Sequence, residues 1–282
     1  MAKMIETLGS VGRGYGVILC DVWGVLHNGM RAFPDAVAAL RAARARGQAV
    51  VLLTNSPRPR AGVAEQLALL DVAADCYDAI VSSGDVTRRL IENGPRRVFH
   101  LGPDRDFALY DGLDVELCEE FEAQTVVCTG MFDDDETPDD YAEMLERFRA
   151  RNLPFICANP DIVVERGDEL IWCAGALARD YARLGGRTEI AGKPHRPIYD
   201  AALAAASDLL GREVARREAL AVGDGVLTDI KGAADNGIDV LFVSGGIHAG
   251  EYGGTGAPDP AAIRAFLHKH GYSPVAVIPR LR

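Results

Sequence analysis

The stretch Gly16-Val-Ile-Leu-Cys-Asp-Val-Trp-Gly24 determines how the rest of this sequence is interpreted. Its four apolar residues, 17–20, are typical of a short strand buried on both faces of a parallel sheet. Asp21 follows directly, so the strand carries a carboxylate to its C-terminal end. Because open α/β sheets bind ligands at the carboxyl ends of their strands, we expect a ligand site here.

Two later stretches share this pattern. The apolar run 50–53 leads into Thr-Asn-Ser at 54–56, and the run 219–222 leads into Gly-Asp-Gly at 223–225. Strand and helix patterns alternate between these stretches, which predicts a parallel sheet with helices on its faces. The three polar strand ends would then meet at one edge of that sheet.

The hydrophobic pattern predicts elements along the whole chain. Helices are expected at residues 34–46, 59–70, 137–151, 174–184, 195–210 and 261–270. Strands are expected at residues 17–20, 50–53, 80–81, 98–101, 125–128, 154–158, 219–222, 240–243 and 274–278. A loop is expected at residues 253–258. We therefore predict an α/β protein with a discontinuous core domain, 1–83 and 190–282, and an inserted α/β cap domain, 84–189.

The composition excludes some classes of partner. A formal net charge of −11 argues against a nucleic-acid backbone or an anionic membrane surface as the main partner. None of the six cysteines forms a Cys-x-x-Cys pair, and most lie in apolar runs. We expect them to be reduced core residues of a cytoplasmic protein. We also expect neither a signal peptide nor a membrane span.

Four polar residues at strand ends and turns supply the groups that phosphoryl transfer needs: Asp21, Thr54, Lys193 and Asp224. An aspartate can attack phosphorus and form an aspartyl phosphate. Two neighbouring carboxylates repel each other unless a cation lies between them, and their hard oxygens suit Mg²⁺. The lysine and threonine can hold phosphoryl oxygens. Each residue alone is more typical of a cap or a turn, so their order and spacing carry the prediction.

This order resembles the haloacid dehalogenase (HAD) superfamily, subfamily IIA, the NagD-like phosphatases. The resemblance covers nearly the whole chain and implies a Rossmann-like, doubly wound parallel sheet as the core. The matching segments are Asp21-Val-Trp-Gly-Val-Leu26, Leu52-Leu-Thr-Asn-Ser56, Gly192-Lys193-Pro194, Gly223-Asp224-x4-Asp229-Ile-x-Gly232, Ala158-Asn159-Pro160-Asp161 and Ala174-Gly175-Ala176.

The resemblance implies roles for the matching residues. Asp21 would be the nucleophile, with Lys193 holding it and the phosphate. Mg²⁺ would be bound by Asp21, the backbone carbonyl of Trp23 and Asp224, with Asp229 supporting either these ligands or the lysine. The implied substrate-binding residues are Thr54, Asn55, Ser56, Asn159 and Asp161. The substrate would be a small phosphorylated metabolite, and the resemblance also implies a homodimer.

Trp23 departs from the family pattern, which has a second aspartate there to protonate the leaving group and activate water. An indole N–H only donates and does not titrate near neutral pH. Loss of general acid–base help, typically worth ~10²–10⁴-fold, would slow alkyl phosphates more than aryl or acyl phosphates. His27 and His195 are candidate substitutes, but we expect the first to pack in its loop and the second to begin a helix.

We predict a Mg²⁺-dependent phosphomonoester hydrolase that works through an aspartyl phosphate on Asp21. The alternatives are a phosphate- and Mg²⁺-binding regulatory module without turnover, or a hydrolase of C–X or C–P bonds.

Two other segments have less specific interpretations. Ser244-Gly-Gly-Ile-His248 is expected to turn over the sheet edge, with a place along the site as the alternative. The acidic run 133–136 is expected to be a solvated helix start.

Overall fold

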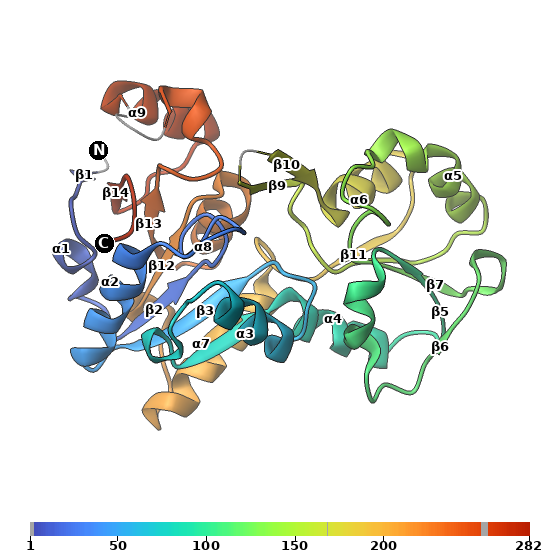
Figure 1. The fold of residues 1–282 in the computed structure, drawn as a ribbon, viewed down its shortest axis with the longest axis horizontal. Helices are drawn as coiled ribbons and strands as arrows, with labels where there is room; N and C mark the ends of the chain where they lie inside the picture. Colours follow the sequence, from blue (N-terminus) through green and yellow to red (C-terminus); the bar gives the residue numbers. More distant parts are fainter. Residues whose placement is uncertain (1–2, 168, 255–258) are drawn as a thin grey trace. The chain divides into compact units, whose positions relative to one another are not determined.

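The computed structural model describes residues 3–167, 169–254 and 259–282 (Figure 1). By the density of their contacts, these residues form two compact units. The first unit comprises Met1–Thr54, Ala64–Val81 and Tyr199–Arg282, and the second comprises Asn55–Val63 and Ser82–Ile198. This division assigns residues 55–63, 82–83 and 190–198 to the second unit, whereas the sequence prediction assigned them to the core. Compactness alone does not identify folding domains, so the predicted domain boundaries stay a prediction.

The first unit is built on a seven-stranded sheet with β2 near its centre. Its strands, in spatial order, are β1 (Lys3–Met4), β14 (Ala276–Ile278), β13 (Asp239–Val243), β12 (Ala219–Gly223), β2 (Val17–Cys20), β3 (Ala49–Thr54) and β4 (Ala79–Ser82). In this spatial order, the five pairings β1–β14, β14–β13, β13–β12, β12–β2 and β2–β3 are all parallel. In register, Cys20 lies opposite Val222 on one side and Leu52 on the other. The carboxyl ends of β2, β3 and β12 therefore lie side by side, as the sequence predicts.

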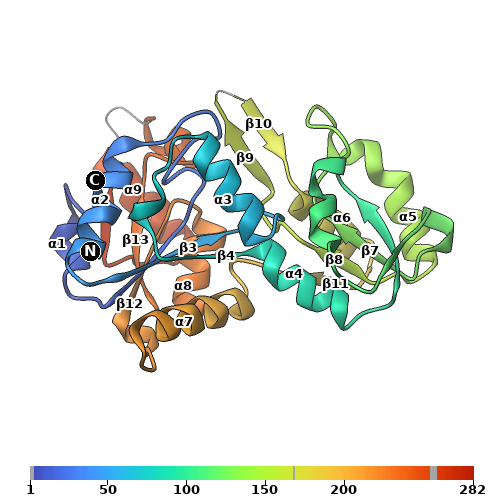
Figure 2. The same ribbon diagram turned by 60° about the horizontal axis from the view of Figure 1, so that its bottom comes forward.

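The residues of these three central strands explain why they form the middle of the sheet. All residues of β2, β3 and β12 are buried, which requires cover on both faces. Figure 2 shows α2 and α7 on opposite faces of the sheet. The helices that lie wholly or partly in this unit are α1 (Gly9–Gly12), α2 (Pro34–Ala45), α3 (Arg60–Leu69), α7 (Arg196–Leu210), α8 (Lys231–Asp235) and α9 (Pro260–His270). The predicted doubly wound α/β core is confirmed.

The second unit has its own five-stranded parallel sheet. Its strands, in spatial order, are β11 (Thr188–Ile190), β8 (Phe155–Cys157), β7 (Thr125–Cys128), β5 (Arg97–Leu101) and β6 (Glu116–Leu117). The longer helices are α4 (Ser83–Glu92), α5 (Ala142–Ala150) and α6 (Ala174–Arg183). Phe148, Phe155 and Tyr181 are fully buried in its core. The Tyr181 hydroxyl satisfies its polar end by donating to the carbonyl of Leu153 at 2.6 Å.

An antiparallel hairpin of β9 (Val163–Arg166) and β10 (Glu169–Trp172) also belongs to the second unit. Short 3₁₀ helices and one π-helix complete the two units: η1 (Ala74–Cys76), η2 (Asp104–Tyr110), η3 (Glu120–Glu122), η4 (Pro138–Tyr141), η5 (Arg216–Glu218), η6 (Val226–Ile230, the π-helix) and η7 (Ala249–Tyr252). No helix among the described residues is long and apolar enough to cross a membrane.

Several elements differ from the sequence prediction. The helix predicted at 137–151 consists of the 3₁₀ turn η4 followed by α5, with Asp140 accepting from the amide of Thr137 at 2.8 Å. The short strands β1, β6 and β11, the hairpin β9–β10 and the helix α4 were not predicted. The hairpin is only partly buried and has no clear hydrophobic period. Helix α4 is amphipathic, with Val86, Thr87 and Ile91 buried, but the sequence prediction assigned no element there. The predicted loop at 253–258 falls mainly outside the described residues.

Candidate active site

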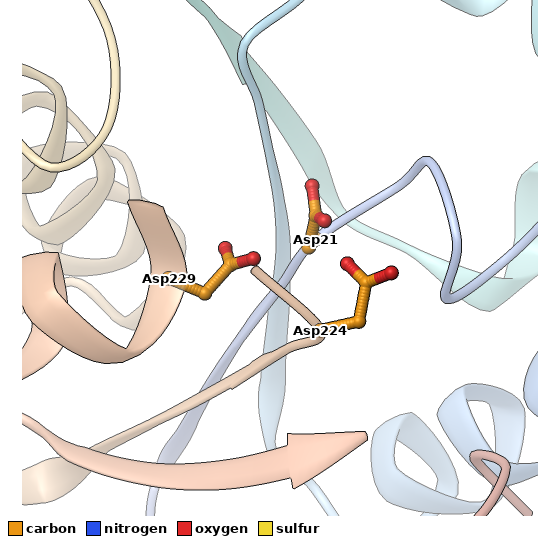
Figure 3. A group of neighbouring side chains, drawn as sticks. All are labelled: Asp21, Asp224 and Asp229. Atoms are coloured by element: carbon orange, nitrogen blue, oxygen red, sulfur yellow. The ribbon is translucent and has the colours of Figure 1, made fainter. Parts of the chain in front are cut away.

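Three buried aspartates meet at the carboxyl edge of the first unit's sheet (Figure 3). Asp21 directly follows β2, Asp224 directly follows β12, and Asp229 lies in the π-helix η6. One oxygen from each carboxylate lies within 4.8 Å of the others. The three residues are only 7%, 5% and 4% exposed, respectively. The structure thus brings together the three acidic residues predicted to form the metal site.

Backbone amides hold two of these carboxylates in place. The amide of Ile247 donates to Asp224 Oδ2 at 2.8 Å, and the amide of Gly225 donates to Asp229 Oδ2 at 3.0 Å. The amide of Asp229 in turn donates to the carbonyl of Gly225 at 2.8 Å, which closes the first turn of η6. Hydrogen bonds from backbone amides thus help to orient both carboxylates and to stabilise their negative charge.

Glycines allow the chain to approach the carboxylates closely. A Cβ atom at Gly246 would lie 1.9 Å from Asp224 Oδ2, and one at Gly24 would lie 2.2 Å from the same atom. A Cβ atom at Gly223 would lie 2.1 Å from Asp229 Cγ. Gly24 also has φ of +82°, a left-handed conformation that glycine adopts without strain. Side chains at these positions would displace the acidic cluster.

The cluster has the chemistry of a site for a hard divalent cation. Three carboxylates this close together and this deeply buried repel each other, and a cation among them would offset that repulsion. Mg²⁺ prefers carboxylate oxygens and usually retains several waters. The donor set therefore fits Mg²⁺, with Asp21 and Asp224 as candidate ligands and Asp229 beside them.

Trp23 is built into the loop that follows the nucleophile position. Its half-buried indole lies across Gly29, where a Cβ atom would come 2.4 Å from Trp23 Cζ2. Gly29 has φ of +81°, so both its conformation and its missing side chain suit the indole. The indole meets the His27 ring edge to face, with centroids 5.0 Å apart and an interplanar angle of 71°. The tryptophan is thus a structural part of this loop.

His27 is a packed residue of the same loop. It is 1% exposed, and its Nδ1 accepts from the amide of Gly29 at 3.0 Å. Burial lowers the pKa of His27 to about 4, so the ring is neutral at neutral pH. His195 is exposed, and its amide donates to the carbonyl of Gly192 directly before α7 begins. Both positions agree with the packing and helix-start interpretations.

Asn55 links the second unit's predicted site residues to one another. Its Oδ1 accepts from the amide of Lys193 at 2.7 Å, and its Nδ2 donates to Asp161 Oδ1 at 2.9 Å. The amide of Asp161 donates to Asn159 Oδ1 at 3.2 Å. Lys193 is 2% exposed and precedes a cis proline, Pro194. Asn55 therefore connects the Gly-Lys-Pro turn to Asp161 through its side-chain hydrogen bonds.

The remaining predicted substrate-binding residues lie on either side of the division between the units. Thr54 ends β3 in the first unit and is buried. Ser56 belongs to the second unit, where its Oγ accepts from the amide of Arg58 at 3.3 Å and its carbonyl accepts from the amide of Gly84 at 3.0 Å. Substrate-binding roles for these residues stay predictions.

The sequence prediction underestimated the loop after β13. Residues 244–248 were expected mainly to turn over the sheet edge, yet Gly246 and Ile247 contact Asp224. The only sequence signal was a Gly-Gly pair directly after a buried strand. A backbone amide carries no residue-type signature, so this donor could not be recognised from the sequence alone.

Comparisons with known proteins agree with this geometry. Family models described as haloacid dehalogenase-like hydrolase and HAD-hydrolase-like match residues 18–116 and 190–265. One similar crystal structure is that of a hydrolase of the haloacid dehalogenase-like family from Brucella suis 1330. The two sequences are 58% identical, and the structures superpose with a TM-score of 0.90. The match covers 99% of this chain and 100% of that chain. Comparison with curated protein sequences gives no match.

More distant structures share the fold. NagD from E. coli K-12 is 22% identical with a TM-score of 0.67, covering 94% of this chain and 96% of that one. A glycerol phosphate phosphatase from Mycobacterium tuberculosis, in complex with calcium, is 25% identical with a TM-score of 0.61, covering 83% and 68%, respectively. The predicted membership of the haloacid dehalogenase superfamily is confirmed.

A matched pair of glycine variants tests the packing around Asp224. Gly246→Ala should force Asp224 out of position, because the new Cβ atom would overlap its whole carboxyl group, at a cost of about 1–3 kcal/mol in stability. Gly250→Ala, four residues further along the chain in η7, has no atom within 4 Å of the new Cβ atom. Thermal unfolding with and without Mg²⁺ should show cation-dependent stabilisation in the wild type and Gly250→Ala, and its loss in Gly246→Ala. Equal stabilisation of all three would contradict this account.

His27 should make stability depend on pH. Since its pKa is about 4 when folded and 6.5 when unfolded, the unfolded chain binds more protons between these values, and the free energy of unfolding falls as pH falls through that window. At pH 5 the loss should be roughly 2 kcal/mol relative to pH 7.5. Urea unfolding at both pH values should show a smaller loss for His27→Asn, which keeps an acceptor for the Gly29 amide but does not titrate. Equal losses would show that His27 titrates normally.

Proposed function

Because the chain belongs to the haloacid dehalogenase-like hydrolase family, we propose that it hydrolyses a phosphate monoester, with Asp21 as the nucleophile. The observation that carries this proposal is the buried cluster of Asp21, Asp224 and Asp229 at the carboxyl ends of parallel strands. Such a cluster is what an Asp nucleophile and a cation-binding partner need. The substrate is a small phosphorylated metabolite, in keeping with the glycerol phosphate phosphatase among the structural neighbours.

The reaction divides into two steps at Asp21. First, a carboxylate oxygen attacks phosphorus, the bond from phosphorus to the ester oxygen breaks, and the alcohol oxygen leaves with the electron pair. Second, water attacks the aspartyl phosphate, releases inorganic phosphate and restores the carboxylate. Bound Mg²⁺ would neutralise charge on the phosphoryl oxygens. Asp21, Asp224 and the carbonyl of Trp23 would hold it, with Asp229 supporting these ligands.

The other predicted residues enter this proposal by their chemistry. The Thr54 hydroxyl can donate to a phosphoryl oxygen, and the ammonium group of Lys193 can neutralise its charge. Asn55 supports the lysine's turn through the contacts at 2.7 Å and 2.9 Å described above. Asn159, Asp161 and Ser56 stay candidates for substrate recognition. A homodimer and a cytoplasmic location stay predictions from the sequence.

One alternative is favoured by a specific observation. Trp23 removes the usual proton-transfer group beside Asp21, and a protein of this fold could then bind Mg²⁺ and a phosphorylated ligand without turnover. In that case a phosphorylated ligand would stabilise the protein against heat without releasing phosphate. Turnover that depends on Asp21 would exclude this alternative.

The experiment is phosphate release from 4-nitrophenyl phosphate with and without Mg²⁺. Wild type should turn over only with the cation. Asp21→Asn should be inactive because its amide is a poor nucleophile, and Asp224→Asn should need more Mg²⁺ because one ligand charge is lost.

Asp239→Asn is the matched control. Asp239 is exposed and begins β13 at the amino end of the sheet, where it accepts a hydrogen bond from Tyr15 at 2.7 Å. This variant should keep wild-type turnover. If wild type releases no phosphate from any aryl phosphate, and Asp21→Asn behaves identically, the proposed function is wrong.

A further inference from the structure

The loop after Asp21 lacks a group that could transfer a proton. Trp23 stands two residues beyond the nucleophile, and the next residue, Gly24, lies against Asp224. The position is therefore close to the reacting carboxylate, but it carries an indole, which neither accepts a proton nor releases one near neutral pH. Its ring is held between Gly29 and the edge of His27. The residue that follows the nucleophile by two positions is thus a fixed indole in place of a group that transfers protons.

Two kinds of neighbouring group in the described part of the first unit do not replace the missing aspartate. His27 is 1% exposed, and its Nδ1 already accepts from the amide of Gly29. The donors identified at Asp224 and Asp229 are the amides of Ile247 and Gly225. Backbone amides stabilise negative charge, but they do not exchange protons during a reaction.

The first chemical step then depends on the leaving group. When Asp21 attacks phosphorus, the departing oxygen takes the electron pair and receives no proton from the protein. A carboxylate leaves readily as an anion at neutral pH, since carboxyl groups have pKa values near 4. A sugar or glycerol alkoxide does not, because it must be protonated as it leaves. The loop therefore selects substrates with acidic leaving groups.

The second chemical step is also affected by the lack of a proton-transfer group at position 23. Water that attacks the aspartyl phosphate must lose a proton, and without a positioned base this proton passes to bulk water. General base catalysis is typically worth ~10²–10⁴-fold, so hydrolysis of the intermediate is slowed by about that factor. With an acidic leaving group the first step is not slowed comparably. The aspartyl phosphate then accumulates.

We propose that Trp23 is a specificity-determining residue that directs this site to acyl phosphates, the mixed anhydrides of carboxylic and phosphoric acids, and makes the phosphoryl group on Asp21 long-lived. The proposal rests on the function proposed above. It has a simple energetic basis, because an aspartyl phosphate is itself an acyl phosphate. Transfer from such a donor exchanges one carboxyl–phosphate bond for another, so Asp21 is loaded at little cost in free energy.

The test is to trap the phosphoryl group. Wild type is mixed with acetyl phosphate and Mg²⁺, and intact-protein mass spectrometry follows the gain of one phosphoryl group and its decay after the donor is removed. Wild type should be phosphorylated by acetyl phosphate but not by glycerol 3-phosphate. Asp21→Asn should not be phosphorylated by either donor.

Two variants at one position isolate proton transfer. Trp23→Asp supplies a carboxylate, and Trp23→Asn supplies a group of nearly equal size that does not titrate. Both remove the indole from Gly29, so thermal unfolding should show similar losses of stability. Trp23→Asp should shorten the lifetime of the phosphorylated protein by about 10²-fold or more relative to Trp23→Asn.

The outcomes separate this inference from the proposed function. Equal lifetimes for Trp23→Asp and Trp23→Asn, or turnover of an aryl phosphate that depends on Asp21 without accumulation of the phosphorylated protein, would overturn the inference and leave the proposed function standing. A phosphorylated protein that never releases phosphate would support the inference and overturn the proposed turnover. No phosphorylation and no turnover with either activated donor would overturn both.

Discussion

The repulsion among three buried carboxylates is the constraint on which the first unit's site depends. At separations within 4.8 Å, an effective dielectric constant of about 20 gives each charged pair roughly 3 kcal/mol of unfavourable energy. The fold keeps the carboxylates together because Asp21 and Asp224 directly follow neighbouring parallel strands. Amide hydrogen bonds at Asp224 and Asp229 offset part of the cost. A cation bound among the three carboxylates would offset the repulsion further.

This arrangement requires close approach of backbone to carboxylate, which explains the glycines around the cluster. Gly24, Gly223 and Gly246 come from three separate segments of the chain, yet each leaves no room for a Cβ atom beside an aspartate. The loop after β13 therefore has two functions: it excludes side chains at Gly246, and it supplies an amide at Ile247. The geometry of the site thus depends on the backbone as much as on the acidic residues.

The sequence was sufficient to predict the parts of the site that depend on strand ends. Asp21, Thr54 and Asp224 lie at the ends of apolar runs. Parallel pairing brings the carboxyl ends of such strands together, and this does not depend on the conformation of the connecting loops. The amide of Ile247 could not be predicted, because every residue except proline has one. In the second unit, the hydrogen bonds of Asn55 to Lys193 and Asp161 were also missed, since both partners lie more than a hundred residues away in the sequence. Helix α4 could have been predicted, since Val86, Thr87 and Ile91 recur at helical spacing and are buried on one face.

Trp23 shows why a missing functional group must be interpreted together with its surroundings. A tryptophan that merely replaced an acid would be expected to project into solvent, but here the loop is shaped to receive it. Gly29 combines a positive φ with a surface that the indole covers, and the buried His27 meets the indole at its edge. Because an acid at position 23 would leave this surface uncovered, the indole and the glycine form one structural unit. The change at position 23 therefore alters both the chemistry beside Asp21 and the loop that shapes it.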